Sequence, residues 1–213
     1  MKSDKKHMLL YAVTDRAWTG KQTLYQQVEA ALRGGVTCVQ LREKDLDEAL
    51  FLQEARELRG LCCQYKVPFI VNDNVDIAIA CKADGVHVGQ EDLAAGEVRR
   101  RIGDEMILGV SVHTVEEARQ AVRDGADYLG LGAVFPTSTK PDADPMSREI
   151  LRAICDAVDV PVVAIGGINR DNLLRLAGSG VDGVALVSAI FSAEDVEGAC
   201  RDLRALSEEM VSL

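Results

Sequence analysis

Gln40, Arg42 and Lys44 stand at alternate positions directly after the apolar run at residues 36–39. Side chains of a β-strand alternate between its two faces, so these three lie on one side if the strand continues through them. An amide and two cations side by side make a poor piece of core and a good binding site for an anion. A solvated strand end leading into a helix is the alternative, and other polar groups at the same place decide between the two.

Two carboxylates further along the chain could hold a metal ion. Asp73 and Asp92 each follow a short apolar run, and Asn72 directly precedes the first of them. If the two runs are neighbouring parallel strands, the carboxylates can face each other, and such a pair beside a phosphate suits Mg²⁺. Each aspartate could instead cap the helix that follows it, a role worth about 1 kcal/mol. The occurrence of both at one edge favours the metal site.

Two further segments have the composition of phosphate-binding loops. A hydroxyl-rich run combines Thr137 and Thr139 with the cation of Lys140, a set that suits phosphate or pyrophosphate. Gly167 and Ser188 follow the last two apolar runs, at a place where barrel enzymes often hold phosphate with backbone N–H groups. A plain surface loop and tight glycine turns are the respective alternatives.

These residues need a scaffold that brings distant segments together, and the hydrophobic pattern predicts one. Amphipathic segments with helical spacing, such as Leu24, Val28 and Ala31, alternate with short β-branched runs. Eight strand–helix units in a chain of this length predict a single-domain α/β fold, the (β/α)8 TIM barrel. A doubly wound open sheet would need a glycine fingerprint after its first strand, where Thr14, Asp15 and Arg16 stand instead. The predicted strands are residues 9–14, 36–42, 69–72, 85–88, 107–111, 128–132, 162–165 and 183–187.

A barrel makes the candidate residues converge, because barrel enzymes place their chemistry at the C-terminal ends of the strands. Ser111 ends the fifth predicted strand, and His113, just beyond it, could act as a base. His87 lies inside the fourth strand and is expected to be a polar member of the barrel interior.

Composition limits the possible partners. The chain has 213 residues, 47% hydrophobic and 27% charged, which is ordinary for a globular domain. A net charge of −10 makes non-specific nucleic-acid binding and an anionic membrane partner unfavourable. No window is apolar for long enough to span a membrane. A phosphate would therefore be bound by a local cationic cluster or a metal ion, and a homo-oligomer is compatible with the sequence.

The cysteines and the N-terminal segment indicate the setting of the fold. Six cysteines without a C-x-x-C pair are expected to be buried thiols in a reducing cytoplasm. Residues 1–7 are polar and are expected to form a flexible tail, so that the catalytic domain covers residues 8–213.

The candidate residues lie in motifs that resemble those of the thiamine-phosphate synthase (thiamine-phosphate pyrophosphorylase) family. The matching segments follow the family's order over nearly the whole chain. They are Gln-Leu-Arg-Glu-Lys at 40–44, Asn-Asp at 72–73, His-Val-Gly-Gln-Glu-Asp at 87–92, Gly-Val-Ser at 109–111, Gly-Ala-Val-Phe-Pro-Thr-Ser-Thr-Lys at 132–140, Ile-Gly-Gly-Ile at 165–168 and Val-Ser at 187–188.

The resemblance implies a (β/α)8 transferase of thiamine biosynthesis that uses Mg²⁺ and two small-molecule substrates. Such an enzyme joins hydroxymethylpyrimidine pyrophosphate to thiazole phosphate and releases pyrophosphate. Departure of the leaving group precedes attack, so that the bond-forming step needs no general base. By motif, the pyrimidine substrate would contact Gln40, Arg42, Lys44, Asn72 and Ser111, and its pyrophosphate would also contact Lys140. The metal would be bound by Asp73 and Asp92. The thiazole phosphate would be bound by Thr137, Thr139, Gly167, Val187 and Ser188.

Three other functions compete with this one. A thiazole tautomerase-like relative would use a histidine resembling His113 as its base, but such relatives lack part of the pyrophosphate and metal set. A non-catalytic barrel that senses a phosphate ligand would not need that set. A phosphosugar isomerase or aldolase would need a catalytic glutamate or a Schiff-base lysine inside a strand. The intact set of Arg42, Lys44, Asp73, Asp92 and Lys140 favours the synthase.

Overall fold

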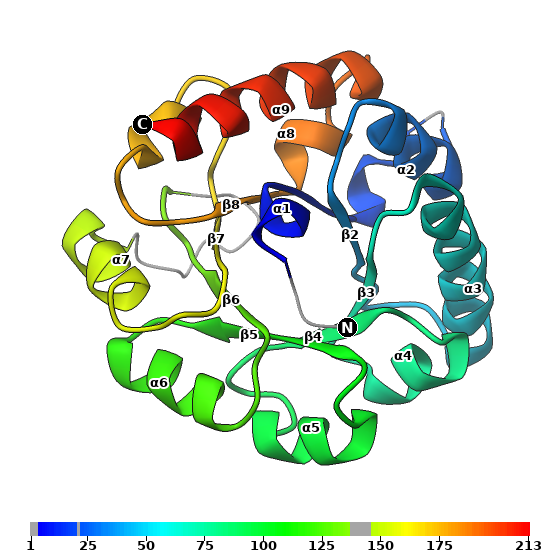
Figure 1. Cartoon of the computed structure of the whole chain (residues 1–213). Coiled ribbons are helices and arrows are strands. Elements are labelled where there is room, and N and C mark those ends of the chain that lie inside the picture. Colours follow the sequence, from blue (N-terminus) through cyan, green and yellow to red (C-terminus); the bar gives the residue numbers. More distant parts are fainter. Residues whose placement is uncertain (1–3, 21, 137–145) are drawn as a thin grey trace.

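The computed structural model, which describes residues 4–20, 22–136 and 146–213, confirms the predicted (β/α)8 barrel. Eight parallel strands close in the order β1 to β8, and Figure 1 shows the helices as a ring around them. The strands are Leu10–Val13 (β1), Cys38–Leu41 (β2), Phe69–Asn72 (β3), Gly85–Val88 (β4), Ile107–Val112 (β5), Tyr128–Leu131 (β6), Val162–Ile165 (β7) and Gly183–Leu186 (β8).

The helices follow the strands in the expected alternation, and polar side chains cap most of them. Thr23 and Gln26, for example, form a reciprocal capping box at the start of α2. The outer helices are α2 (Leu24–Arg33), α3 (Glu48–Tyr65), α4 (Val75–Cys81), α5 (Ala95–Ile102), α6 (Val115–Arg123), α7 (Arg148–Cys155) and α9 (Val196–Ser212). The short ones are α1 (Lys5–Met8), η1 (Arg16–Trp18), η2 (Leu173–Leu176) and α8 (Ser188–Phe191).

A polar side chain directly before each even-numbered strand accepts a hydrogen bond from the preceding strand and so supports the strand register. Asp84, Asp127 and Asp182 precede β4, β6 and β8, and each carboxylate accepts a hydrogen bond from a backbone N–H of the preceding strand, at 2.8–2.9 Å. Thr37 does the same before β2, where its hydroxyl accepts from Leu10 N at 2.9 Å. One side chain thus joins each odd strand to the next even one, and this fixes the height at which the strand ends reach the rim.

The N-terminal segment differs from the expected tail. Lys5–Met8 form helix α1 because Asp4 caps it, accepting from Lys6 N. Met8 is completely buried against the barrel interior, and Lys5 pairs with Asp182 at 2.8 Å. Figure 1 shows α1 over the centre of the barrel, so the ordered domain begins before residue 8.

Strand alternation divides the buried residues into two clusters. Leu10 and Ala12 face the surrounding helices, whereas Tyr11 and Val13 face the barrel axis. The inner cluster contains one or two residues from most strands: Tyr11, Val13, Cys38, Ile70, Ile107, Tyr128, Val163 and Ala185, with Met8 below them. The interior of the barrel is therefore a packed core.

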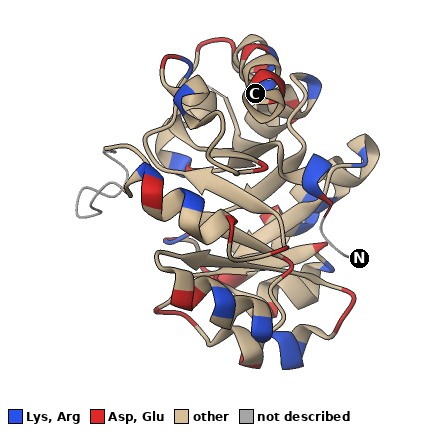
Figure 2. Ribbon diagram, turned by 60° about the vertical axis from the view of Figure 1, so that its left-hand side comes forward, with Lys and Arg blue, Asp and Glu red and all other residues tan. Residues whose placement is uncertain are grey.

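Charges of both signs are mixed over the surface, and the cysteines are buried only in part. Figure 2 shows acidic and basic residues interspersed over the helices. None of the helices in the described ranges is both long and apolar enough to cross a membrane. All six cysteines are free; four are buried, Cys155 is partly buried and Cys63 is exposed.

Gly109 tests the packing of the inner cluster. A β-carbon on this residue would lie 2.2 Å from the ring of Tyr128, so we expect Gly109→Ala to lower the free energy of unfolding by about 1–3 kcal/mol. Urea unfolding measures the change. Gly60→Ala is the control, because Gly60 lies in α3 with no atom within 4 Å of the added carbon, and alanine there should be neutral or stabilise. Equal stability of the two variants would contradict this account of the core.

Candidate active site

The inward side of strands β2, β3 and β5 turns from apolar to polar near the C-terminal rim. Gln40 stands two residues after the inward Cys38, and Asn72 stands two residues after the inward Ile70. Ser111 follows Ile107 by four positions. Because strand side chains repeat every two residues, these polar groups point into the barrel above its apolar core.

Five inward side chains, Gln40 and Ser111 among them, form a continuous hydrogen-bonded series, which we call the interior network. Gln40 Nε2 donates to the Tyr11 hydroxyl at 2.9 Å. The Tyr11 and Tyr128 hydroxyls lie 2.8 Å apart, and His87 Nδ1 lies 2.9 Å from the latter. The other ring nitrogen, His87 Nε2, lies 2.9 Å from Ser111 Oγ. The network connects two predicted substrate-binding side chains, Gln40 and Ser111, through the centre of the barrel.

Burial keeps the two tyrosines of the network protonated. Complete burial raises the pKa of Tyr11 and the pKa of Tyr128 well above the ordinary value, so both hydroxyls remain protonated and available as donors. Gly130 leaves room for His87, since a β-carbon there would lie 3.1 Å from the imidazole. His87 is thus a polar member of the interior, as predicted. Sequence reasoning missed the two tyrosines, although their two-residue spacing from other inward positions was a usable signal.

Asp73 and Asp92 meet at the rim, and neither caps a helix. Asn74 is the N-cap of α4, where its side chain accepts from Ile77 N at 2.9 Å. Helix α5 begins after Ala94, without a side-chain cap. The Asp92 carboxylate instead accepts from Gly89 N within the β4–α5 loop, at 2.7 Å. The capping interpretation is therefore wrong for both aspartates.

The electrostatics of this pair indicate a place for a cation. Desolvation of its carboxyl, followed by a hydrogen bond to Asp92 and the charge of Asp92, raises the pKa of Asp73 to about 6. Arg42 and the amide of Asn72, which donates to Asp73 Oδ2 at 2.6 Å, act in the opposite direction. Two facing carboxylates of this kind repel each other when both are ionised, and a bound divalent cation would relieve the repulsion.

The donor set fits Mg²⁺ better than a metal that needs a full protein cage. Within residues 4–20, 22–136 and 146–213, no three His, Cys, Asp or Glu side chains gather closely enough to hold a metal. Mg²⁺ is commonly held by one or two carboxylates and completes its shell with waters and substrate phosphates. The pair at Asp73 and Asp92 meets that requirement.

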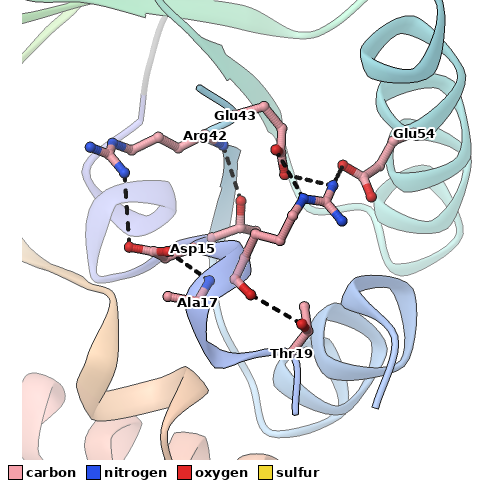
Figure 3. Close-up of polar contacts among 8 residues, drawn as sticks. Asp15, Ala17, Thr19, Arg42, Glu43 and Glu54 are labelled. Carbon is pink, nitrogen blue, oxygen red and sulfur yellow. Dashed lines mark hydrogen bonds and ion pairs between the residues drawn. The ribbon is translucent and has the colours of Figure 1, made fainter. Parts of the chain in front are cut away.

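The cations of the β2 loop only partly follow the expected alternation. Strand β2 ends at Leu41, so strand geometry carries Gln40 inward but does not extend to Lys44, which is exposed on the loop. Arg42 is held at the rim, where its backbone N–H donates to Thr14 Oγ1 at 3.0 Å and its guanidinium lies 3.9 Å from Asp15. Figure 3 shows that the side chains of Arg42 and Glu43 leave the backbone in opposite directions.

The last two strands contribute a compact backbone surface. Gly167 has a φ of +66°, and a β-carbon there would lie 2.4 Å from Pro136 O, so only glycine fits between the loops after β6 and β7. Val187 packs against the inner cluster and precedes Ser188, the first residue of α8. Thr137, Thr139 and Lys140 lie outside the described residues.

Asp73→Asn tests the repulsion between the two carboxylates. The folded pKa of about 6 exceeds the ordinary 3.8, so the carboxyl's contribution to stability is most favourable below pH 3.8 and is lost as the pH rises to 6. Asparagine tolerates the left-handed φ of +60° at this position. We expect the variant to raise the Tm of the metal-free protein at about pH 7.5 by about 2–4 °C, an estimate that allows for solvent screening.

The same comparison at about pH 4 should show little gain, and calorimetry at both pH values measures the difference. Asp104→Asn, at an exposed aspartate between α5 and β5, is the control and should leave the Tm unchanged at both. An equal gain at the two pH values would show that the carboxyl pair is not the cause.

Comparisons with known proteins identify the family. The family model described as thiamine monophosphate synthase matches residues 10–190. Two curated relatives named thiamine-phosphate synthase are similar over most of their length. The relative from Clostridium tetani is 48% identical, and the match covers 94% of this chain and 96% of the relative. The relative from Chloroflexus aurantiacus is 52% identical, and the match covers 92% of this chain and 91% of the relative.

A solved structure leads to the same family. The thiamine phosphate pyrophosphorylase from Pyrococcus furiosus superposes with a TM-score of 0.90 at 42% identity, covering 97% of this chain and 98% of that one. The barrel, the matched residues and these relatives agree: the chain belongs to the thiamine monophosphate synthase family of transferases.

Proposed function

We propose that the chain condenses 4-amino-5-hydroxymethyl-2-methylpyrimidine pyrophosphate with 4-methyl-5-(2-phosphoethyl)thiazole, or its carboxylated form, to give thiamine phosphate and pyrophosphate. The observation that carries the proposal is the pair of Asp73 and Asp92. These carboxylates meet beside Arg42 and cap no helix, which suits a site for a pyrophosphate and its metal. The six free thiols suit a reducing compartment such as the cytoplasm.

The pyrimidine substrate would bind across the first half of the barrel rim. Gln40 and Ser111 end the interior network, and their polar atoms would orient the pyrimidine ring. Arg42 and Lys44 would bind the pyrophosphate oxygens, with Asn72 beside them. A guanidinium offers paired donors to a phosphate, whereas an ammonium acts as a point charge.

Asp73 and Asp92 would hold Mg²⁺. When bound, the ion would neutralise part of the negative charge that grows on the departing pyrophosphate. Arg42, Lys44 and Lys140 would add positive charge to the same oxygens, and such stabilisation of developing charge is a large term in catalysis.

The thiazole phosphate would bind across the second half of the rim. Gly167, Val187 and Ser188 would supply backbone N–H groups and a hydroxyl to the phosphate, a use of the last two loops that is common in barrels. Thr137 and Thr139 would add their hydroxyls. This arrangement would hold the thiazole nitrogen against the pyrimidine methylene carbon, which is the bond to be formed.

The step would be dissociative and would need no general base. The pyrophosphate would leave with the electron pair of its C–O bond, and the thiazole nitrogen would donate its lone pair to the resulting cation. Two observations support this assignment. Both ring nitrogens of His87 lie within 2.9 Å of the hydroxyls of Tyr128 and Ser111. His113 has a largely exposed side chain beside Glu117.

One assay tests the function. The purified protein, mixed with the pyrimidine pyrophosphate, the thiazole phosphate and Mg²⁺, should form thiamine phosphate and pyrophosphate in equal amounts, and removal of Mg²⁺ by a chelator should stop the reaction. Absence of product at saturating substrate, with thiazole tautomerase activity instead, would favour the tautomerase-like alternative.

Two variants test the assigned roles. Asp92→Ala and Lys140→Ala should each lower kcat by about a hundredfold or more, because each removes charge stabilisation from the leaving group, and should change the Tm little. Asp104→Ala and Lys6→Ala are the matched controls, at exposed positions away from the rim. Turnover near that of the wild type in either test variant would remove that residue from the proposed mechanism.

A further inference from the structure

Glu43 is an acidic residue between the two proposed pyrophosphate-binding cations of the β2 loop. Its side chain is only 3% exposed, although its neighbours Arg42 and Lys44 reach the solvent-facing rim. A buried carboxylate is costly without a partner. A free carboxylate at this place would also compete with phosphate for the adjacent cations.

Arg16 supplies the partner of Glu43. Its Nε and Nη2 donate to the two carboxylate oxygens of Glu43 at 3.1 and 2.9 Å, a fork-shaped pair. The same Nη2 donates to Glu54 Oε2 on α3 at 2.7 Å. The guanidinium of Arg16 thus links the β2 loop to helix α3 through its contacts with Glu43 and Glu54, which are drawn as dashed lines in Figure 3.

The two residues before Arg16 hold Arg42. Thr14 Oγ1 accepts from Arg42 N at 3.0 Å, and the Asp15 carboxylate lies 3.9 Å from the Arg42 guanidinium. Asp15 is itself oriented by Ala17, whose backbone N–H donates to it at 3.0 Å. Three consecutive residues after β1, which we call the β1 clamp (Thr14, Asp15 and Arg16), therefore hold two consecutive residues after β2.

We infer that Arg16 is a positioning residue for pyrophosphate binding. It holds the carboxylate of Glu43 away from Arg42 and Lys44, so that both cations stay available to the pyrophosphate. With Glu43 turned towards α3, Arg42 is directed to the opposite side, over the rim. The inference rests on the proposed role of these cations. It predicts an effect that is specific for the pyrophosphate-bearing substrate.

The first experiment compares Arg16→Ala with a matched arginine. We expect Arg16→Ala to raise the KM for the pyrimidine pyrophosphate, and the inhibition constant of inorganic pyrophosphate, on the order of tenfold. The KM for thiazole phosphate should stay within about twofold, because its proposed site lies on the other half of the rim. Arg33→Ala is the control: Arg33 is 46% exposed against 44% for Arg16 and also bridges two glutamates, Glu29 and Glu197. It ends α2, at the opposite end of the barrel.

A second pair of variants separates this role from a general structural one. Arg16→Ala combined with Glu43→Gln should recover much of the lost pyrophosphate affinity, because the released carboxylate is gone. Arg16→Lys, which keeps the charge but loses the fork, should fall between the wild type and Arg16→Ala.

Three results would overturn the inference. They are an Arg16→Ala variant that behaves like Arg33→Ala, equal increases in both KM values, and a double variant that recovers nothing. Inactivity of the wild type would instead count against the proposed function. In that case, the rise in Tm that inorganic pyrophosphate with Mg²⁺ gives the wild type and Arg16→Ala would still test the role of Arg16. If Arg16→Ala does not fold, Arg16→Lys carries the same comparison.

Discussion

The hydroxyl groups of Tyr11 and Tyr128 lie 2.8 Å apart in the middle of the barrel, and the arrangement above them depends on this contact. Both side chains are almost completely buried, and a buried hydroxyl that lacks a hydrogen bond costs about 1–3 kcal/mol. Each hydroxyl therefore has a second partner, Gln40 on one side and His87 on the other. The need to satisfy two buried hydroxyls thus fixes polar side chains on β2 and β4 and, through His87, Ser111 on β5.

The register of the strands makes this network possible. Asn72 pairs with His87 across β3 and β4, and Ser111 with Gly130 across β5 and β6. A shift by one residue would turn each inward side chain to the helix side. The side chains before the even-numbered strands oppose such a shift, since each accepts a backbone hydrogen bond from the neighbouring strand. Stability at the lower end of the barrel and geometry at the rim are therefore linked.

Charge near the rim is organised locally against an acidic background. The chain carries a net charge of −10, yet the proposed substrates are anions, so attraction must come from a few cations at short range. The acidic neighbour between two of these cations, Glu43, is engaged by Arg16, whereas Asp73 and Asp92 meet at the rim as the proposed metal ligands. The carboxylate of Glu43 is thus kept away from the cations, and those of Asp73 and Asp92 are placed where a metal ion with its phosphate could bind.

The amino-acid sequence by itself determined the scaffold and named the candidate residues of the rim. Short β-branched runs separated by amphipathic segments predict the eight strands, and strand alternation assigns a face to Gln40, because side-chain alternation is a local property of the backbone. The polar composition of residues 1–7 did not reveal helix α1, whose stability depends on Asp4 as its cap and on the burial of Met8 under the barrel.

Only the tertiary structure decided which side chains are partners. In the sequence alone, Asp73 and Asp92 could each have capped the following helix, but Asn74 caps α4, and α5 begins after Ala94 without a side-chain cap. Arg16 reaches Glu43 and Glu54 across 27 and 38 positions of sequence, and Tyr11 reaches Tyr128 across 117. Local periodicity assigns a face to a residue, but a hydrogen bond or ion pair forms within about 3 Å. Which atoms come that close is settled only when distant strands close into one barrel.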